Sequence, residues 1–285
     1  MPTASAQTVS FSARDGYTLA GSWWGPEDPA RVVMINAATA VPRRFYRHFA
    51  AALAEAGYGV LTYDYRGIGD SAPRSLRGFS ARMRDWGMQD MAGALDWVRA
   101  RHRGADISMV GHSVGGQLAG LLDNADEVDG IATFSAQSGH WRLQGGAQKA
   151  MVALHMHLTF PAMARAVGYI PWSKFGGGED LPAGVAREWA RWCRDPRYLF
   201  GDPTLPLHRY AAFEAPVLAY SFDDDDWGTA RSVDTLMREY PRVQRRHVAP
   251  AEVGLRAIGH FGFFRPGAAG MWPDVVKWLG APAAA

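Results

Sequence analysis

The chain has one cysteine in 285 residues and no long hydrophobic run. A single cysteine, Cys193, excludes an internal disulfide framework and is typical of a reducing compartment, so we expect a cytoplasmic protein. Its sequence neighbours offer no partner, and we interpret it as a packing residue. Residues 1–10 lack the basic and apolar segments of a secretory signal, and no apolar run approaches the ~20 residues of a membrane-spanning helix.

The chain also lacks an excess of either charge, since its formal net charge is only +2. Acidic residues separate its arginine-rich stretches, which we interpret as solvated helix faces. This pattern gives no support for nucleic-acid binding. The composition is 48% hydrophobic, and a chain of this length can bury about three quarters of its unfolded surface. We therefore expect a globular protein with one large domain, with or without an insertion.

Short apolar runs alternate with helical patterns along most of the chain. A hairpin with an Asp-Gly turn is expected at residues 7–24, and strands are expected at residues 32–35, 58–63, 107–110, 128–134, 215–222 and 243–249. Helices are expected at residues 43–56, 88–101, 230–240 and 272–279. Strands that alternate with helices predict an α/β protein with a mostly parallel central sheet and helices on both faces.

The alternation stops between residues 136 and 210, where tryptophan and methionine are frequent. Helical patterns cover residues 148–167 and 185–194, no strand pattern is convincing, and the glycine-rich residues 174–182 are expected to be flexible. A structureless loop of this length is improbable inside a compact domain. We therefore predict a helical cap at residues 136–210, inserted into an α/β core made of residues 1–135 and 211–285.

The motif Gly-His-Ser-Val-Gly at residues 111–115 lies between an expected strand and a small-residue segment, residues 117–122, of helical character. Gly-x-Ser-x-Gly at a strand-to-helix turn is the pattern of a nucleophile elbow. The tight turn holds the serine in a strained conformation that exposes its hydroxyl, which makes Ser113 a candidate nucleophile. The alternative interpretation is an ordinary glycine-rich turn.

A serine nucleophile requires a base, and nine histidines are available. His260 is the best candidate because it follows the last expected strand, and ligands bind at the carboxyl ends of parallel strands. Five others have structural interpretations. These are His247 within a strand, His102 at a helix end, His112 packing in or lining the site, and His155 with His157, which lie two apart on a helix and therefore face different ways.

The acid is expected between the serine and the histidine in chain order. Four consecutive aspartates, residues 223–226, directly follow the strand expected at residues 215–222. From the pattern alone, one of the four is held inward beside His260 and the rest form a solvated turn. The earlier loop at residues 134–138 contains no carboxylate, which removes the common alternative position.

These motifs resemble those of the α/β-hydrolase-fold serine hydrolases, in the group of serine aminopeptidase-like and monoacylglycerol-lipase-like enzymes. The resemblance rests on the motif at residues 111–115, on Asp-Tyr-Arg-Gly-Ile-Gly-Asp-Ser at residues 64–71, on the strand and turn after Pro216, and on Gly-His-Phe at residues 259–261. It covers most of the chain outside the cap and implies the α/β-hydrolase fold.

The resemblance also implies the remaining site residues. In such enzymes the catalytic aspartate often follows a strand-opening proline by nine positions, which corresponds to Asp225, with Asp224 as the alternative. The oxyanion hole would be formed by the backbone N–H groups of Val114 and Ala38. This chain reads Asn-Ala-Ala at residues 36–38, where relatives read His-Gly-x, so the loop before Ala38 is more restricted.

The resemblance implies a serine hydrolase that needs no cofactor or metal and cleaves a small carboxylic ester, or a related amide, through an acyl-enzyme. The cap tryptophans favour a small-molecule acyl substrate with an apolar or aromatic group, whereas Glu179 and Asp180 are possible ligands for a substrate amine. An acyltransferase, a C–C hydrolase, a lyase and a non-catalytic ligand-binding protein are the alternatives. The sequence does not predict an oligomeric state.

Overall fold

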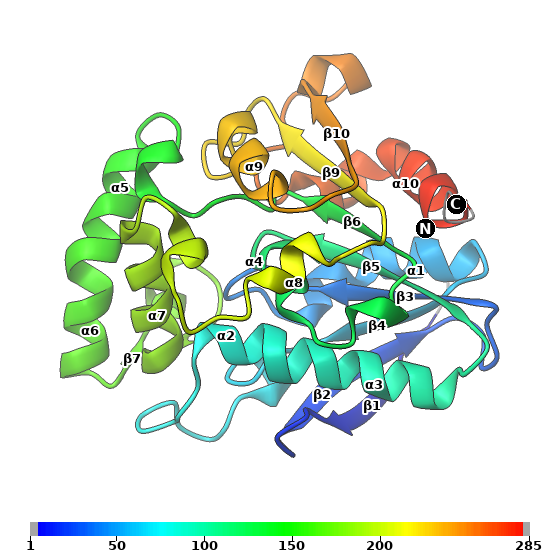
Figure 1. Ribbon diagram of the computed structural model, residues 1–285, viewed down its shortest axis with the longest axis horizontal. Coiled ribbons are helices and arrows are strands. Elements are labelled where there is room, and N and C mark those ends of the chain that lie inside the picture. Colours follow the sequence, from blue (N-terminus) through cyan, green and yellow to red (C-terminus); the bar gives the residue numbers. More distant parts are fainter. Residues whose placement is uncertain (1–4, 282–285) are drawn as a thin grey trace.

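The computed structural model describes residues 5–281 and shows a central sheet of eight strands (Figure 1). The strands are β1 (Gln7–Ser12), β2 (Thr18–Trp24), β3 (Arg31–Asn36), β4 (Gly59–Tyr63), β5 (Asp106–His112), β6 (Gly130–Phe134), β9 (Val217–Phe222) and β10 (Val243–Val248). Their order across the sheet is β1-β2-β4-β3-β5-β6-β9-β10. Only the pairs β1–β2 and β2–β4 are antiparallel, which confirms the predicted mostly parallel sheet.

Burial explains why these segments form strands. The inner strands β4, β6 and β9 are buried at every residue, as expected for strands covered on both faces. The residues of the edge strands β1 and β10 are exposed or partly buried, apart from the buried Phe11. Because the strands from β4 to β10 across the sheet are parallel, their carboxyl ends meet at one edge of the sheet, where α/β proteins bind ligands.

Helices cover both faces of the sheet, as predicted. The long helices of the core are α1 (Arg47–Glu55), α3 (Ala92–Arg101), α9 (Ala230–Met237) and α10 (Trp272–Leu279). In Figure 1, α3 crosses in front of the sheet, whereas α1 lies behind it and contacts α10. Shorter helical segments directly precede two of these helices. The 3-10 turn η1 (Arg43–Tyr46) leads into α1, and α2 (Met83–Asp85) with the π-helical η3 (Trp86–Met91) leads into α3.

The helix after β5 is shorter than expected. The sequence predicts helical character at residues 117–122, but α4 (Val114–Gln117) has a single turn and is followed by the 3-10 turn η4 (Ala119–Leu121). Glycine is a poor helix former, and residues 114–121 contain three glycines. Gly120 also packs against the ring of Tyr210, where a Cβ atom would lie 2.3 Å from a ring carbon. Glycine content and packing against Tyr210, which is distant in the chain, thus replace a longer helix.

In the cap region, which we define as residues 136–210, the longer helices lie at one end of the molecule, at the left of Figure 1. They include α5 (Gln148–Leu154), the π-helical η7 (His155–Thr159), α6 (Phe160–Ala166) and α7 (Ala183–Arg194). The expectation that this region has no strands is wrong, since β7 (Tyr169–Ile170) pairs antiparallel with β8 (Leu181–Pro182). Two-residue strands are too short to produce an alternating sequence pattern.

The segment at residues 174–182, expected to be flexible, contacts the core. The Glu179 N–H donates to the Ala40 carbonyl at 2.8 Å, and the Glu179 carboxylate pairs with Arg44 at 2.7 Å. At the other end of the cap region, the boundary expected at residue 210 falls inside α8 (His208–Ala211). Tyr210 packs on Tyr240 of the core, with ring centroids 5.2 Å apart. The division into core and cap stays a prediction.

The motif at residues 64–71 joins loops of the core. Arg66 binds Asp15 in the hairpin turn and the buried Asp90 in η3, with nitrogen–oxygen distances of 2.6 and 2.7 Å. The Asp64 carboxylate accepts backbone N–H bonds from Arg43 and Asp70. No helix within residues 5–281 is both long and apolar enough to cross a bilayer.

Candidate active site

Ser113 lies at the turn between β5 and α4 in a backbone conformation that non-glycine residues rarely adopt, with φ 51° and ψ −117°. Its N–H donates to the Phe134 carbonyl of the neighbouring strand at 2.9 Å. The backbone around the two flanking glycines lies too close to leave room for a side chain. A Cβ at Gly111 would lie 2.5 Å from the Gly116 Cα, and one at Gly115 would lie 2.1 Å from the Asn36 carbonyl oxygen. These contacts hold the turn in its strained form.

The structure brings His260 and Asp225 together. The distance from His260 Nδ1 to Asp225 Oδ2 is 2.9 Å, and the Asp225 side chain is fully buried. Because a carboxylate only accepts, Nδ1 is assigned the proton, and Nε2 is left with its lone pair. Burial by itself raises the pKa of Asp225, but attraction to His260 and the Gly228 N–H bond outweigh it and lower the pKa to about 2. Asp225 is therefore ionised at neutral pH.

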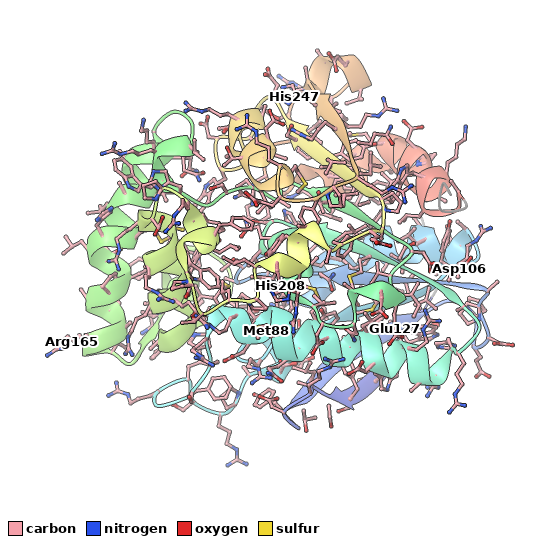
Figure 2. All side chains as sticks on the ribbon, viewed as in Figure 1. Met88, Asp106, Glu127, Arg165, His208 and His247 are labelled. Carbon is pink, nitrogen blue, oxygen red and sulfur yellow. The ribbon has the colours of Figure 1, made fainter. Side chains whose placement is uncertain are left out.

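The neighbouring aspartate makes different contacts. Asp224 Oδ2 and Oδ1 accept the backbone N–H bonds of Ile258 and Gly259, at 2.8 and 2.9 Å. These bonds fasten the loop that carries His260. Asp223 is exposed and lies 3.5 Å from His247 on β10, at the top of the molecule in Figure 2. Of these three aspartates, only Asp225 contacts the imidazole of His260.

Ser113 and His260 line the same cavity, which has a volume of about 630 Å³. This is the size of a pocket for a small organic ligand. Part of its wall is apolar and comes from the cap region, including Val152, Trp172 and Trp189. The Ser113 hydroxyl has no hydrogen-bond partner within 3.5 Å among residues 5–281. Catalytic hydrogen bonds are often long in ligand-free enzymes and tighten when substrate binds.

Two backbone segments near Ser113 offer N–H groups: the start of α4, which directly follows it, and the loop with Ala38 and Thr39, which lines the same cavity. The N–H of Val114, the first residue of α4, has no acceptor within the described residues. The Ala38 N–H, in contrast, donates to the buried Tyr46 hydroxyl at 2.8 Å. In the same loop, the Thr39 N–H has no acceptor in residues 5–281. The sequence gives no sign of the contact between Ala38 and Tyr46, because Tyr46 belongs to the next helical segment.

A buried hydrogen-bond chain connects this loop to the His260 loop. His112 Nε2 lies 2.8 Å from the His260 carbonyl oxygen, and His112 Nδ1 lies 2.8 Å from the Tyr46 hydroxyl. A carbonyl only accepts, so Nε2 donates and Nδ1 accepts the tyrosine proton. Burial, with a smaller contribution from the charge of His260, lowers the pKa of His112 to about 3. His112 is therefore a neutral positioning residue.

The cavity lining contains arginines but no carboxylate among residues 5–281. The arginines are Arg44, Arg47 and Arg265. The two acidic residues that the sequence offers as amine ligands have other partners: Glu179 pairs with Arg44, and Asp180 Oδ1 accepts from the Ser173 hydroxyl at 2.6 Å. A substrate ammonium group would thus find no carboxylate in this cavity.

Two glutamines of the cap region were not identified from the sequence. The Oε1 atoms of Gln144 and Gln148 are buried at the cavity without a hydrogen-bond partner in the described chain. Gln144 precedes α5 and Gln148 begins it, and two glutamines near a helix start carry no functional signal in the sequence. An unpaired buried amide oxygen is costly, and both groups are available to a polar group of a ligand.

The two histidines that the sequence offers as a metal pair have other contacts. His155 Nδ1 lies 2.8 Å from Thr159 Oγ1, and the His157 ring meets the Trp141 ring edge-on. No group of three or more potential metal ligands occurs in residues 5–281. The single cysteine, Cys193, is buried at the cavity wall, and burial raises the pKa of its thiol.

Residues 27–176, more than half of the chain, match the family described as serine aminopeptidase, S33. The chain belongs to this family. The strand order and the elbow after β5 agree with the α/β-hydrolase fold of a serine hydrolase, as predicted. Among proteins with curated descriptions, no sequence matches the hydrolase.

Solved structures show the same fold at low sequence identity. DcsB, in complex with its substrate analogue, is 13% identical with a TM-score of 0.67, over 96% of the hydrolase and 99% of DcsB. The esterase Pf2001 of Pyrococcus furiosus is 14% identical with a TM-score of 0.63, over 99% and 93%. The esterase EaEST of Exiguobacterium antarcticum is 14% identical with a TM-score of 0.63, over 96% and 100%. At these identities the likeness establishes the fold alone.

Proposed function

We propose that the hydrolase cleaves a small carboxylic ester through an acyl-enzyme on Ser113. The observation that carries the proposal is the 2.9 Å contact between His260 and the buried Asp225, at the same cavity as the strained Ser113. A hydroxyl becomes a good nucleophile only when a base removes its proton and a third group orients that base. These three residues fit those roles.

In the first half of the reaction, His260 Nε2 takes the proton of Ser113 while the serine oxygen attacks the ester carbonyl. Asp225 stabilises the imidazolium that forms. Protonated His260 then returns its proton to the leaving alcohol, which departs as the acyl–oxygen bond breaks. In the second half, His260 deprotonates a water, the water attacks the acyl-enzyme, and the carboxylic acid leaves as Ser113 regains its proton.

Two backbone donors would stabilise the oxyanion in this proposal. Val114 N–H is the first, and it has no competing acceptor in residues 5–281. Ala38 N–H is the second, shared between the Tyr46 hydroxyl and the oxyanion in a three-centre hydrogen bond. A donor of this kind contributes about 3 kcal/mol to lowering the barrier.

The charges of the cavity support an ester rather than an aminopeptidase substrate. A free amino terminus requires a negative partner, and the described cavity lining has none. The esterases of similar fold are consistent with this choice. The apolar cap wall with Val152, Trp172 and Trp189 supports an apolar or aromatic acyl group.

Covalent labelling tests the proposal. A fluorophosphonate probe should label the wild-type protein at one site, and para-nitrophenyl esters of short acids should be hydrolysed. Ser113→Ala should abolish the labelling and lower hydrolysis by about 10⁴-fold or more, because no nucleophile remains. Arg103→Gln, a change on the surface at the opposite edge of the sheet, serves as the matched control. Wild-type protein that is neither labelled nor active would refute the proposal.

A further inference from the structure

The mouth of the cavity carries an unusual charge pattern. Three arginines line it, whereas none of the described lining residues is acidic. Arg44 and Arg47 belong to η1 and the start of α1, directly after the loop with Ala38. Arg265 follows the His260 loop. The two segments meet through the rings of Phe45 and Phe261, whose centroids are 6.1 Å apart and whose planes are nearly perpendicular.

Two of these arginines are not neutralised. Arg44 pairs with Glu179 at 2.7 Å. The Arg47 guanidinium contacts only the Arg44 carbonyl oxygen, at 3.2 Å, and Arg265 has no carboxylate within 4.0 Å among residues 5–281. Both side chains are exposed. The rim, defined as Arg44, Arg47 and Arg265, therefore has a net charge of +2 after Glu179 is included.

The proposed chemistry decides which part of the substrate lies at this rim. His260 must deliver its proton to the leaving alcohol, so the alcohol lies beside His260. From there Phe261, which is 39% exposed, and Arg265 continue along the cavity mouth to the surface. In the proposed reaction the acyl group occupies the apolar wall of the cap region, with Val152, Trp172 and Trp189. The arginines are thus placed to meet the alcohol portion.

We infer that the substrate is an ester of an apolar acid with an alcohol that carries a carboxylate or a phosphate. Arg47 and Arg265 bind this anion, and Glu179 weakens the contribution of Arg44 by pairing with it. Guanidinium groups suit both anions because their planar donors match oxygen pairs. The inference rests on the proposed ester hydrolysis and extends it to the leaving group.

Matched esters measure the preference. The substrates are butyrate esters of para-carbamoylbenzyl alcohol, para-carboxybenzyl alcohol and para-phosphonobenzyl alcohol. The carbamoyl compound has nearly the shape of the carboxylate but no charge, and the phosphonate compound distinguishes the two anions. Selectivity is the ratio of kcat/KM for an anionic ester to that for the carbamoyl ester. Wild-type protein should favour at least one anion by about fivefold or more at low salt.

Charge variants then change this selectivity in opposite directions. Arg47→Gln and Arg265→Gln should each lower it about threefold, and the double variant about tenfold. Glu179→Gln should raise it about twofold, since the amide keeps a hydrogen-bond acceptor for Arg44 but no longer neutralises it. Arg103→Gln removes the same charge at the opposite edge of the sheet and should leave all rates unchanged. One molar salt should reduce the selectivity, because it shortens the Debye length to about 3 Å.

The outcomes separate this inference from the proposed function. Hydrolysis of the carbamoyl ester without a preference for either anion would overturn the inference and leave ester hydrolysis in place. A preference that Arg47→Gln and Arg265→Gln do not reduce would also overturn it. If no ester is hydrolysed and the fluorophosphonate probe does not react, the proposed function fails and the inference falls with it.

Discussion

Asp224 and Asp225 are neighbours in the chain, and their side chains have different surroundings. Asp225 is buried and holds the His260 ring, whereas Asp224 accepts two backbone N–H bonds from the His260 loop. The sequence identifies a group of four aspartates and, through the family resemblance, favours Asp225. The contacts with Ile258 and Gly259 give Asp224 a separate structural purpose that the sequence does not reveal.

Replacing the two aspartates separately tests this division. Asp225→Asn should lower kcat by about 10⁴-fold, because an amide donates toward His260 Nδ1 and favours the wrong tautomer. Asp224→Asn retains one acceptor for the loop, so its activity should fall by less than about tenfold and its stability by about 1–2 kcal/mol. Steady-state kinetics and urea unfolding measure both effects. Equal losses of activity in the two variants would contradict the assignment of Asp225.

His112 links the elbow to the His260 loop and must stay neutral to do so. Its folded pKa, about 3, lies below the ordinary value of 6.5. Between these values the unfolded chain binds a proton at this residue and the folded chain does not. Stability therefore falls as the pH drops through 6.5, and the loss continues until about pH 3.

This linkage predicts a measurable pH dependence. Between pH 7 and pH 5 the His112 contribution should cost the wild-type protein about 2 kcal/mol, since each pH unit below 6.5 costs about 1.4 kcal/mol. Urea unfolding at the two pH values should show a smaller loss in His112→Asn. The control is His208→Gln, at an exposed position marked in Figure 2, which should lose as much stability as wild type. Parallel losses in all three proteins would exclude His112 as the cause.

At the scale of elements, sequence patterns succeed where burial imposes them. β4, β6 and β9 are buried along their whole length and mostly apolar because both faces are covered, so their positions and parallel orientation are predictable. The elbow is equally predictable, because neighbouring backbone atoms leave no room for a Cβ at residues 111 and 115, so both must be glycine. Local sterics and burial leave a signal in the sequence itself.

Patterns fail where a distant contact decides the conformation. The segment after α4 continues as a 3-10 turn in which Gly120 packs against Tyr210, a residue ninety positions later in the chain. The strands β7 and β8 form because they pair with each other, and they are too short to show a periodic sequence pattern. The bond from the Ala38 N–H to the Tyr46 hydroxyl is of the same kind, which is why the sequence treats this N–H as unoccupied.

At the scale of the whole molecule, a buried ionic network joins the core to the cap region. Arg84 of α2 lies 2.7 Å from Glu188 of α7 and 2.8 Å from Asp202, and all three side chains are largely buried. Arg84 also donates to Thr204 Oγ1 at 2.8 Å. Although burial opposes it, hydrogen bonds from Thr204 and Trp192 lower the pKa of Asp202 to about 2. Its charge thus persists at neutral pH and requires a partner.

Removing Arg84 should destabilise the protein because it leaves two buried carboxylates short of a cation. Arg84→Met should lower the free energy of unfolding by about 3 kcal/mol, with the nearby Arg191 supplying partial compensation to Asp202. Arg82→Met is the matched control, since Arg82 is exposed and lies 3.5 Å from Asp85, and it should cost less than about 1 kcal/mol. Urea unfolding followed by tryptophan fluorescence measures both.

If the network couples the two regions, Arg84→Met should also expose α7 to limited proteolysis before the core unfolds. Equal stability of the two variants would show that the network does not hold the cap region to the core.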